Sequence, residues 1–102
     1  MKLVELAHAR SGDKGNHANI GVIARNRKAF ELIEKLLTPE KVANYFSGLK
    51  PTQVERFRMP GILAFNFLLH NALGGGGSRS LRIDSQGKTL ATVILEMDLE
   101  TE

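Results

Sequence analysis

Cysteine is absent from the 102-residue sequence, and its absence excludes several kinds of chemistry. The chain has no disulfide framework, no thiolate nucleophile and no cysteine-ligated zinc or iron–sulfur site. Its three histidines are the remaining strong ligands for a soft metal, but they form neither an H-x-H nor an H-x-x-x-H motif. We therefore expect no bound metal and no cofactor.

Aromatic residues and long apolar runs are also scarce. Aromatic residues make up only 6% of the chain, whereas proteins that bind single-stranded nucleic acid use aromatic rings to stack the bases. No run approaches the ~20 apolar residues of a membrane-spanning helix. Charge interrupts the opening residues MKLVE too early for a secretory signal. We expect a cytoplasmic protein that binds neither nucleic acid nor a membrane.

The residues that are present are those of an ordinary globular domain. Hydrophobic residues account for 42% of the chain and charged residues for 25%, and the length fits a single domain over residues 1–102. The net charge is +3, but four of the eleven acidic residues lie in the last seven, EMDLETE. The remaining 95 residues carry an excess of seven basic groups, which would attract anionic partners.

The first half of the chain predicts two strands and two helices. Residues 3–8 are expected to form a strand with Val4, Leu6 and His8 on one face, and residues 18–24 a second strand with apolar side chains at every other position. The polar residues between them would then form a loop. From residue 27 the apolar spacing becomes helical, and a second short helix follows, with Thr38 as its N-cap and Pro39 as its first residue.

The second half predicts an edge strand, a buried helix and a hairpin. Residues 53–59 fit an exposed edge strand that ends at Pro60-Gly61. The apolar residues 62–73 are expected to form a largely buried helix that ends at Gly74. Alternation at residues 81–83 and 91–99 predicts a C-terminal hairpin. The fold class is therefore α+β: a ferredoxin-like two-layer sandwich with a mainly antiparallel sheet and helices on one face.

The motif SGDKGN carries the first group of candidate site residues. Gly12 and Gly15 flank two charged residues, and glycine backbones on either side would turn both charges toward one point. Asp13 is a candidate general base and Lys14 an electrophile or anion anchor, with His17 beside them. The alternative is a loop whose Asp and Asn side chains cap their own backbone. The candidate catalytic residues are Asp13, Lys14 and His17, and no metal ligand is assigned.

The segment AFNFLLHNALGGGGSRS carries the second group. Asn66 and His70 lie four residues apart, so on a helix they share one stripe and either face the same cleft as the first motif or bond to each other and to backbone. The four glycines follow a helix rather than precede one, so they are not a P-loop. They are a helix C-cap or, with two nearby arginines, an anion nest. The candidate ligand-binding residues are Arg10, Ser11, Asn16, Asn19, Asn66, His70, Gly75, Gly76, Ser78, Arg79 and Arg82.

Two segments together resemble a known family. They are LAHARSGDKGNHANIGVIAR, residues 6–25, and MPGILAFNFLLHNALGGGGSRSLRIDSQGK, residues 59–88, followed by a hydrophobic final strand. The chain is similar to the small C-terminal ferredoxin-fold domain of the acyclic terpene utilisation (AtuA-like) family. The resemblance implies a ferredoxin-like domain and a role in catabolism of branched or terpenoid acyl-CoA compounds. In that family the motif usually follows a much larger N-terminal domain, whereas here the chain begins just before the first expected strand.

Two functions are expected from these observations. The first is an accessory domain or subunit that binds an anionic, acyl-CoA-like ligand. The alternative is a non-catalytic oligomerisation or scaffolding module for a larger enzyme. Because a domain of this size has little room for a closed pocket, the site is expected at a subunit boundary. The expected partners are further copies of the chain, as a dimer or higher oligomer, or a separate large N-terminal-type subunit, together with a CoA-type small molecule.

Overall fold

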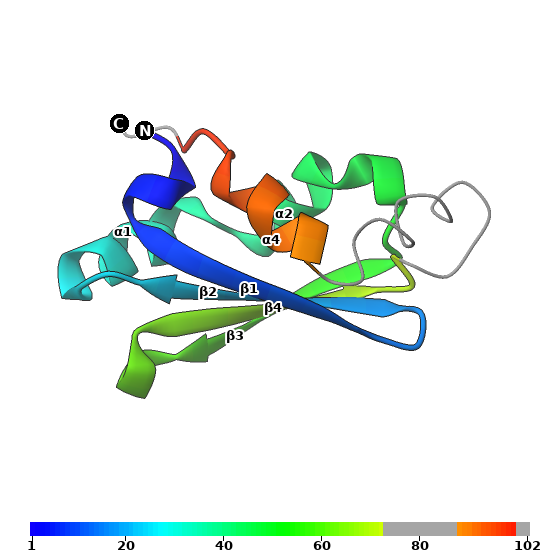
Figure 1. Ribbon diagram of the computed structural model, residues 1–102, viewed down its shortest axis with the longest axis horizontal. Helices are drawn as coiled ribbons and strands as arrows, with labels where there is room; N and C mark the ends of the chain where they lie inside the picture. The colour runs from blue at the N-terminus through cyan, green and yellow to red at the C-terminus, as the bar shows by residue number, and fades with distance from the viewer. Residues whose placement is uncertain (73–87, 100–102) are drawn as a thin grey trace.

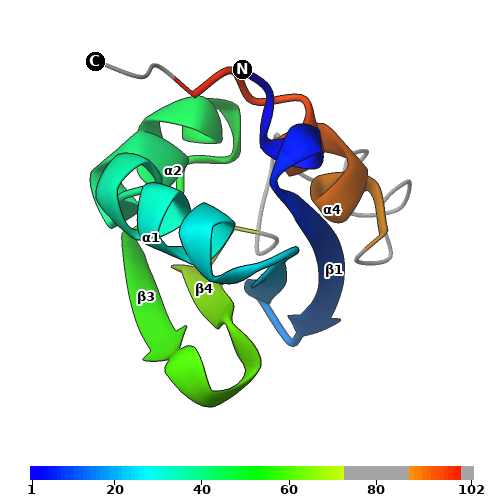
Figure 2. The same cartoon turned by 90° about the vertical axis from the view of Figure 1, so that its left-hand side faces the viewer.

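The computed structural model describes residues 1–72 and 88–99. Its elements are η1 (Leu3–Glu5), β1 (Ala7–Lys14), β2 (His17–Ala24), α1 (Arg27–Leu36), α2 (Pro39–Tyr45), η2 (Ser47–Leu49), β3 (Gln53–Met59), η3 (Pro60–Ile62), β4 (Ala64–His70) and α4 (Lys88–Leu95). The four strands form one antiparallel sheet in the order β1-β2-β4-β3. The helices α1, α2 and α4 all lie on one face of this sheet (Figures 1 and 2). The expected α+β, ferredoxin-like sandwich is confirmed.

The chain reaches the ferredoxin-like sheet order with one strand in a different place in the sequence. The usual ferredoxin-like chain runs strand, helix, strand, strand, helix, strand. Here β2, the α1–α2 pair, β3, β4 and α4 follow that order, and the strand that would come last is β1, which precedes β2 in the chain. Since β1 pairs with β2 through a tight hairpin, the same sheet arrangement is reached.

The N-terminal hairpin differs from the prediction. The polar stretch from Arg10 to Asn19 is not a loop, because β1 and β2 stay paired as far as Lys14 opposite His17 and only two residues form the turn. Gly15, the first turn residue, has a φ of +62°, which glycine adopts without steric cost. Antiparallel pairing satisfies the backbone whatever the side chains, so a polar sequence can remain a strand. The strand also begins later than expected, since residues 3–5 form a 3-10 turn.

The middle of the chain folds as its spacing predicts. Residues of β2 alternate between buried and half-buried positions, and α1 begins after Asn26, whose side chain accepts a hydrogen bond from the Ala29 amide at 2.8 Å. Thr38 caps α2 in the same way, accepting from the Lys41 amide at 3.1 Å. The strand β3 is at the sheet edge, as expected.

The apolar segment at residues 62–73 is a central strand and not a helix. In β4, Phe65, Phe67 and Leu69 are fully buried under the helices, while the residues between them are half-buried on the other face. A central strand has neighbours on both sides, so it carries apolar residues on both faces and its sequence looks like a buried helix. Left-handed backbone at Leu63 and Asn71 ends the strand on either side.

The C-terminal hairpin is also not formed, because residues 88–95 are the helix α4. Leu90, Ala91 and Ile94 are buried at helical spacing and pack against the sheet. Their β-branched neighbours favour a strand locally, but tertiary burial of this helical stripe decides the structure. The other half of the expected hairpin, at residues 81–87, lies outside the described residues.

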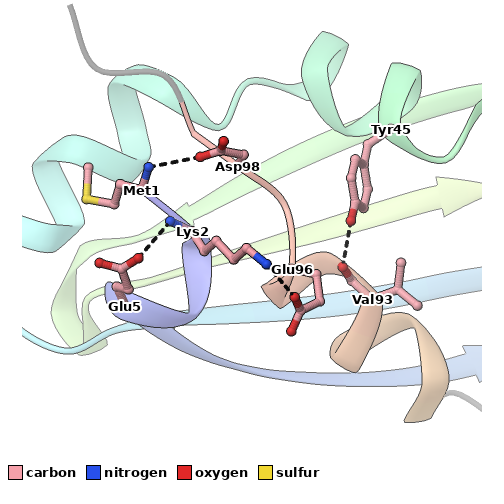
Figure 3. A network of polar contacts seen from close by, with 7 residues as sticks. All are labelled: Met1, Lys2, Glu5, Tyr45, Val93, Glu96 and Asp98. Carbon is pink, nitrogen blue, oxygen red and sulfur yellow. Dashed lines mark hydrogen bonds and ion pairs between the residues drawn. The ribbon is translucent and has the colours of Figure 1, made fainter.

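The first and last described segments are joined directly (Figure 3). The Leu3 amide donates to the Met97 carbonyl at 2.9 Å, and the Leu99 amide donates to the Met1 carbonyl at 2.7 Å. Two ion pairs accompany these bonds: the Met1 amino group with Asp98 and Lys2 with Glu96, each at 2.9 Å. Among residues 1–72 and 88–99, no helix is long and apolar enough to cross a membrane.

Candidate functional site

The sheet has one face that none of the described helices covers (Figure 1), and several of the candidate residues lie there. Alternation along each strand places one set of side chains under the helices and the other set on this second face, which we call the open sheet face. Its residues are His8, Arg10 and Gly12 from β1, His17, Asn19, Gly21 and Ile23 from β2, Ala64, Asn66, Leu68 and His70 from β4, and Gln53, Glu55, Phe57 and Met59 from β3.

Five candidates from three separate strands meet on the open sheet face: Arg10, His17, Asn19, Asn66 and His70. Two of them share a row of the sheet, since β1 and β4 flank β2 and the registers align Arg10, Gly21 and Asn66 side by side. Asn66 and His70 were expected to share a face because of helical spacing. They do share one, because residues four apart on a strand also point to the same side.

Two glycines leave the centre of this face bare. A Cβ on Gly21 would lie 3.8 Å from the Arg10 carbonyl oxygen and 4.0 Å from Asn66 Oδ1, and a Cβ on Gly12 would meet no atom within 4 Å. The backbone of β1 and β2 is therefore accessible between the neighbouring side chains. A ligand can approach the sheet closely here, which a residue with a side chain would prevent.

The polar side chains around this bare strip have no hydrogen-bond partner among residues 1–72 and 88–99. Within the described part of the chain, the side chains of Arg10, Asn19 and Asn66 form no hydrogen bond or ion pair. Arg10 is exposed and the two asparagines are half-buried. A guanidinium and two amides offer the donors that bind a carboxylate or phosphate.

At the hairpin end of the face, two histidines and a glutamate form a cluster. His70 Nε2 lies 2.8 Å from Glu55 Oε1, and the His17 and His70 rings meet edge to face with centroids 5.1 Å apart. The Asn71 amide donates to His17 Nδ1 at 3.0 Å, while Thr52 Oγ1 accepts from the side-chain amide of Asn71 at 3.0 Å. The cluster joins β2, β3 and β4 at the point where these strands end or begin.

These hydrogen bonds fix the proton positions on the neutral rings. Because His17 Nδ1 accepts from a backbone amide, its proton is on Nε2, which meets no acceptor in the described part of the chain. A carboxylate only accepts, so His70 donates Nε2–H to Glu55 and its Nδ1 carries the lone pair. The two rings thus present one donor and one acceptor side by side, which is suited to holding or moving a proton.

The SGDKGN residues do not form the predicted loop, because the first four of them belong to β1. Asp13 and Lys14 are therefore consecutive residues of a strand. Asp13 pairs with Ala18 on the helix-covered side and is exposed at its rim, whereas His17 lies on the open sheet face. The Lys14 side chain is outside the description, and Asn16 is exposed in the turn.

Ser11 faces the helices, and its hydroxyl accepts a hydrogen bond from the Ala91 amide at 3.0 Å. It therefore holds the first turn of α4 against β1. His8 and His17 lie at opposite ends of the antiparallel hairpin. His8 Nε2 lies 3.1 Å from Arg25 Nη1.

The candidates of the glycine-rich segment are Gly75, Gly76, Ser78, Arg79 and Arg82, and all lie outside the described residues. Among the residues that are described, no three His, Asp or Glu side chains could hold a metal ion.

Sequence reasoning missed Glu55 and its neighbours Thr52 and Asn71. The alternation of residues 53–59 does place Glu55 and Phe57 on one face of a strand, but the pairing with His70 was hidden because β4 was interpreted as a helix. A hollow of about 430 Å³ lies between α2 and the C-terminal segment. It is lined by Lys41, Asn44, Tyr45, Met97 and Asp98. None of the candidate residues borders it.

Comparison with protein families gives a match over most of the sequence. The family model described as the AtuA ferredoxin-like domain matches residues 1–100, which is nearly the whole chain. No curated protein and no solved structure matches the sequence.

Proposed function

Because the chain belongs to the AtuA ferredoxin-like domain family, we propose that it is an accessory domain or subunit that binds an anionic, acyl-CoA-like ligand on its open sheet face. One observation carries the proposal: Arg10, Asn19 and Asn66 surround a strip of bare backbone and make no hydrogen bond to the described residues. Catabolism of branched or terpenoid acyl compounds in the cytoplasm is the setting that the proposal assumes.

Each group on this face has a role in the proposed binding. The Arg10 guanidinium binds a carboxylate or phosphate through two parallel hydrogen bonds, and the amides of Asn19 and Asn66 donate from the other side of the strip. Ile23 and Leu68 are half-buried on the same face and offer apolar contact to an acyl chain. A long, partly apolar anion therefore matches this surface better than a small inorganic ion does.

The imidazole cluster supplies the acid–base groups of the proposed site. His70 Nδ1 accepts a proton while Glu55 stabilises the resulting charge, and His17 Nε2–H donates to an oxygen of the ligand. Proton transfer by Asp13 and anion anchoring by Lys14 remain predictions, as does any turnover. Both the binding and the acid–base roles are properties of the chain's own residues and need no cofactor.

Thermal unfolding with and without ligand tests the binding proposal. Coenzyme A and short branched acyl-CoA thioesters are added to the wild-type chain and to an Arg10→Ala, Asn66→Ala variant. A ligand at a hundredfold excess over its Kd stabilises the fold by about 2.7 kcal/mol, which raises the Tm by about 10 °C or more. We expect this shift in the wild type and its loss in the variant.

Arg27→Ala, combined with Asn44→Ala, is the matched control. It removes one arginine and one exposed asparagine from the helical layer and should keep the full shift. If no acyl-CoA compound shifts the wild-type Tm, or if the control loses the shift equally, the proposed site is wrong.

The alternative function, a scaffolding module, is favoured by a different observation. Phe57 and Met59 in β3 have 46% and 40% of their surface exposed on the same face, and Ile62, in the turn η3 that follows β3, has 63% exposed. Neighbouring exposed large apolar side chains are typical of a protein interface. Assembly without any ligand effect would support this function over the first.

A further inference from the structure

On the open sheet face, the positions without a side chain lie on one half and larger side chains lie on the other. In one row of the sheet the registers align Gly12 and Asn19 with Leu68 and Glu55, and in the next they align Arg10 and Gly21 with Asn66 and Phe57. Both glycines therefore lie on the β1–β2 half of the face. On the β4–β3 half, every position of these two rows carries a large side chain.

Such a surface is complementary to itself. A two-fold axis parallel to the strands would place β1 of one copy over β3 of a second copy, and β2 over β4. Gly12 would then lie opposite Glu55 of the second copy, and Gly21 opposite Asn66 of the second copy. Each bare position on one copy receives a large side chain from the other.

Charge favours the same arrangement. The outward side chains of β1 include His8 and Arg10, whereas those of β3 are Gln53, Glu55, Phe57 and Met59. With the axis along the strands, Arg10 lies over the ring of Phe57 of the second copy and one row from its Glu55. With the axis across the strands, β1 would lie on β1 and bring like charges together. The first axis also gives the aligned packing common in β-sandwiches.

The face is large enough for a specific interface. Seven paired residues along four strands span about 24 by 19 Å, or about 450 Å² in projection. Two copies would therefore bury about 1,000 Å² in total, which is the lower limit for a specific protein–protein contact. Phe57 and Met59, now 46% and 40% exposed, would be among the residues covered.

We propose that a second copy of this chain packs face to face on the open sheet face, related by a two-fold axis parallel to the strands. The inference rests on the shape and charge of the face and does not need the ligand proposal. Because Glu55 and Asn66 of the second copy fill the bare positions at Gly12 and Gly21, the second copy and the proposed ligand compete for the same strip of this face.

Engineered cysteines test the arrangement directly, because the chain has no cysteine of its own. Within one chain, positions 12 and 55 are three interstrand spacings apart, about 14 Å, which is too far for a disulfide. In the proposed dimer they face each other. Under oxidation, Gly12→Cys, Glu55→Cys should form a covalent dimer that a thiol reductant reverses.

Controls separate this dimer from other assemblies. An equal mixture of the Gly12→Cys and Glu55→Cys single variants should cross-link as well, whereas each single variant alone should stay largely monomeric on a non-reducing gel. Cross-linking by Gly12→Cys alone, as strong as in the double variant, would instead place β1 on β1 and overturn the proposal.

Sedimentation equilibrium of the unmodified wild type, without ligand, gives the second measurement. We expect a mass of twice the 11.2 kDa chain. A monomeric mass at every concentration up to the solubility limit would refute the second copy as occupant and leave a larger partner protein to cover the face.

Discussion

At the scale of single residues, the three histidines differ most clearly in the partners that their ring nitrogens meet. His8 Nε2 faces the Arg25 guanidinium, which only donates, so its ring must accept there. His17 accepts through Nδ1 from a backbone amide, and His70 Nε2 faces the Glu55 carboxylate. The neighbours of the three rings therefore favour one tautomer for His8 and the other for His17 and His70.

These contacts predict the tautomer of each neutral ring. We expect the proton of His8 on Nδ1 and the protons of His17 and His70 on Nε2. Glu55→Ala removes the acceptor of His70, so that ring alone should become a mixture of both tautomers. Long-range ¹H–¹⁵N correlation spectra at a pH where the rings are neutral measure all three populations, and His8 and His17 serve as internal controls. A fixed His70 tautomer in the variant would contradict the role assigned to Glu55.

The residues of the candidate site could be predicted in part from the sequence. Asn66 and His70 are predicted site residues because a polar stripe on a buried segment needs partners, and Arg10 and Asn19 because they lie close to Asp13 and Lys14 in the sequence. All four lie on the open sheet face. Their spatial neighbours could not be predicted in the same way. Glu55 meets His70 only through the β3–β4 register, which a single sequence does not reveal once β4 is interpreted as a helix.

At the scale of elements, the predictable segments are those with one buried side. Buried positions recur with a clear helical period in α1 and at every second residue in β2, so the type of each element follows from the sequence. The strand β4 and the helix α4 are apolar on most sides because each packs against several elements. For such segments the period is weak, and long-range pairing or packing decides between strand and helix.

Two phenylalanines test the different roles of the central and edge strands. Phe67 in β4 is fully buried, whereas Phe57 in β3 is 46% exposed on the open sheet face. Phe67→Ala should lower the free energy of unfolding by about 3–5 kcal/mol, because it leaves a cavity in the core. Phe57→Ala should cost about 1 kcal/mol or less, measured by urea unfolding at a concentration where the chain is monomeric. Equal losses would mean that Phe57 is buried within the single chain.

At the scale of the whole molecule, the last described segment closes onto the first. The Met97 carbonyl accepts a hydrogen bond from the Leu3 amide, and the Leu99 amide donates one to the Met1 carbonyl. Asp98, between them, accepts a hydrogen bond from the Met1 amino group at 2.9 Å (Figure 3). This closure keeps β1 and α4, which are far apart in sequence, at fixed positions on the sheet.

The closing ion pair makes stability depend on pH with a definite sign. The hydrogen bond to Asp98 raises the pKa of the Met1 amino group above its ordinary value of 8.0, and the same bond lowers the pKa of Asp98 below 3.8. The amino group therefore stabilises the fold fully below pH 8.0, and this contribution is lost as the pH rises through its raised pKa. The carboxylate stabilises the fold above pH 3.8, and its contribution is lost as the pH falls through its lowered pKa.

Asp98→Asn should therefore lower the Tm most between about pH 4 and pH 8, and the difference from wild type should shrink on either side. Because both groups are exposed, we expect a small effect that 1 M salt removes. Asp13→Asn is the matched control, since that exposed carboxylate has no partner among the described residues and its loss should leave the Tm profile unchanged. A Tm difference that keeps the same size well below pH 4 and well above pH 8 would show that Asp98 acts through backbone geometry and not through its charge.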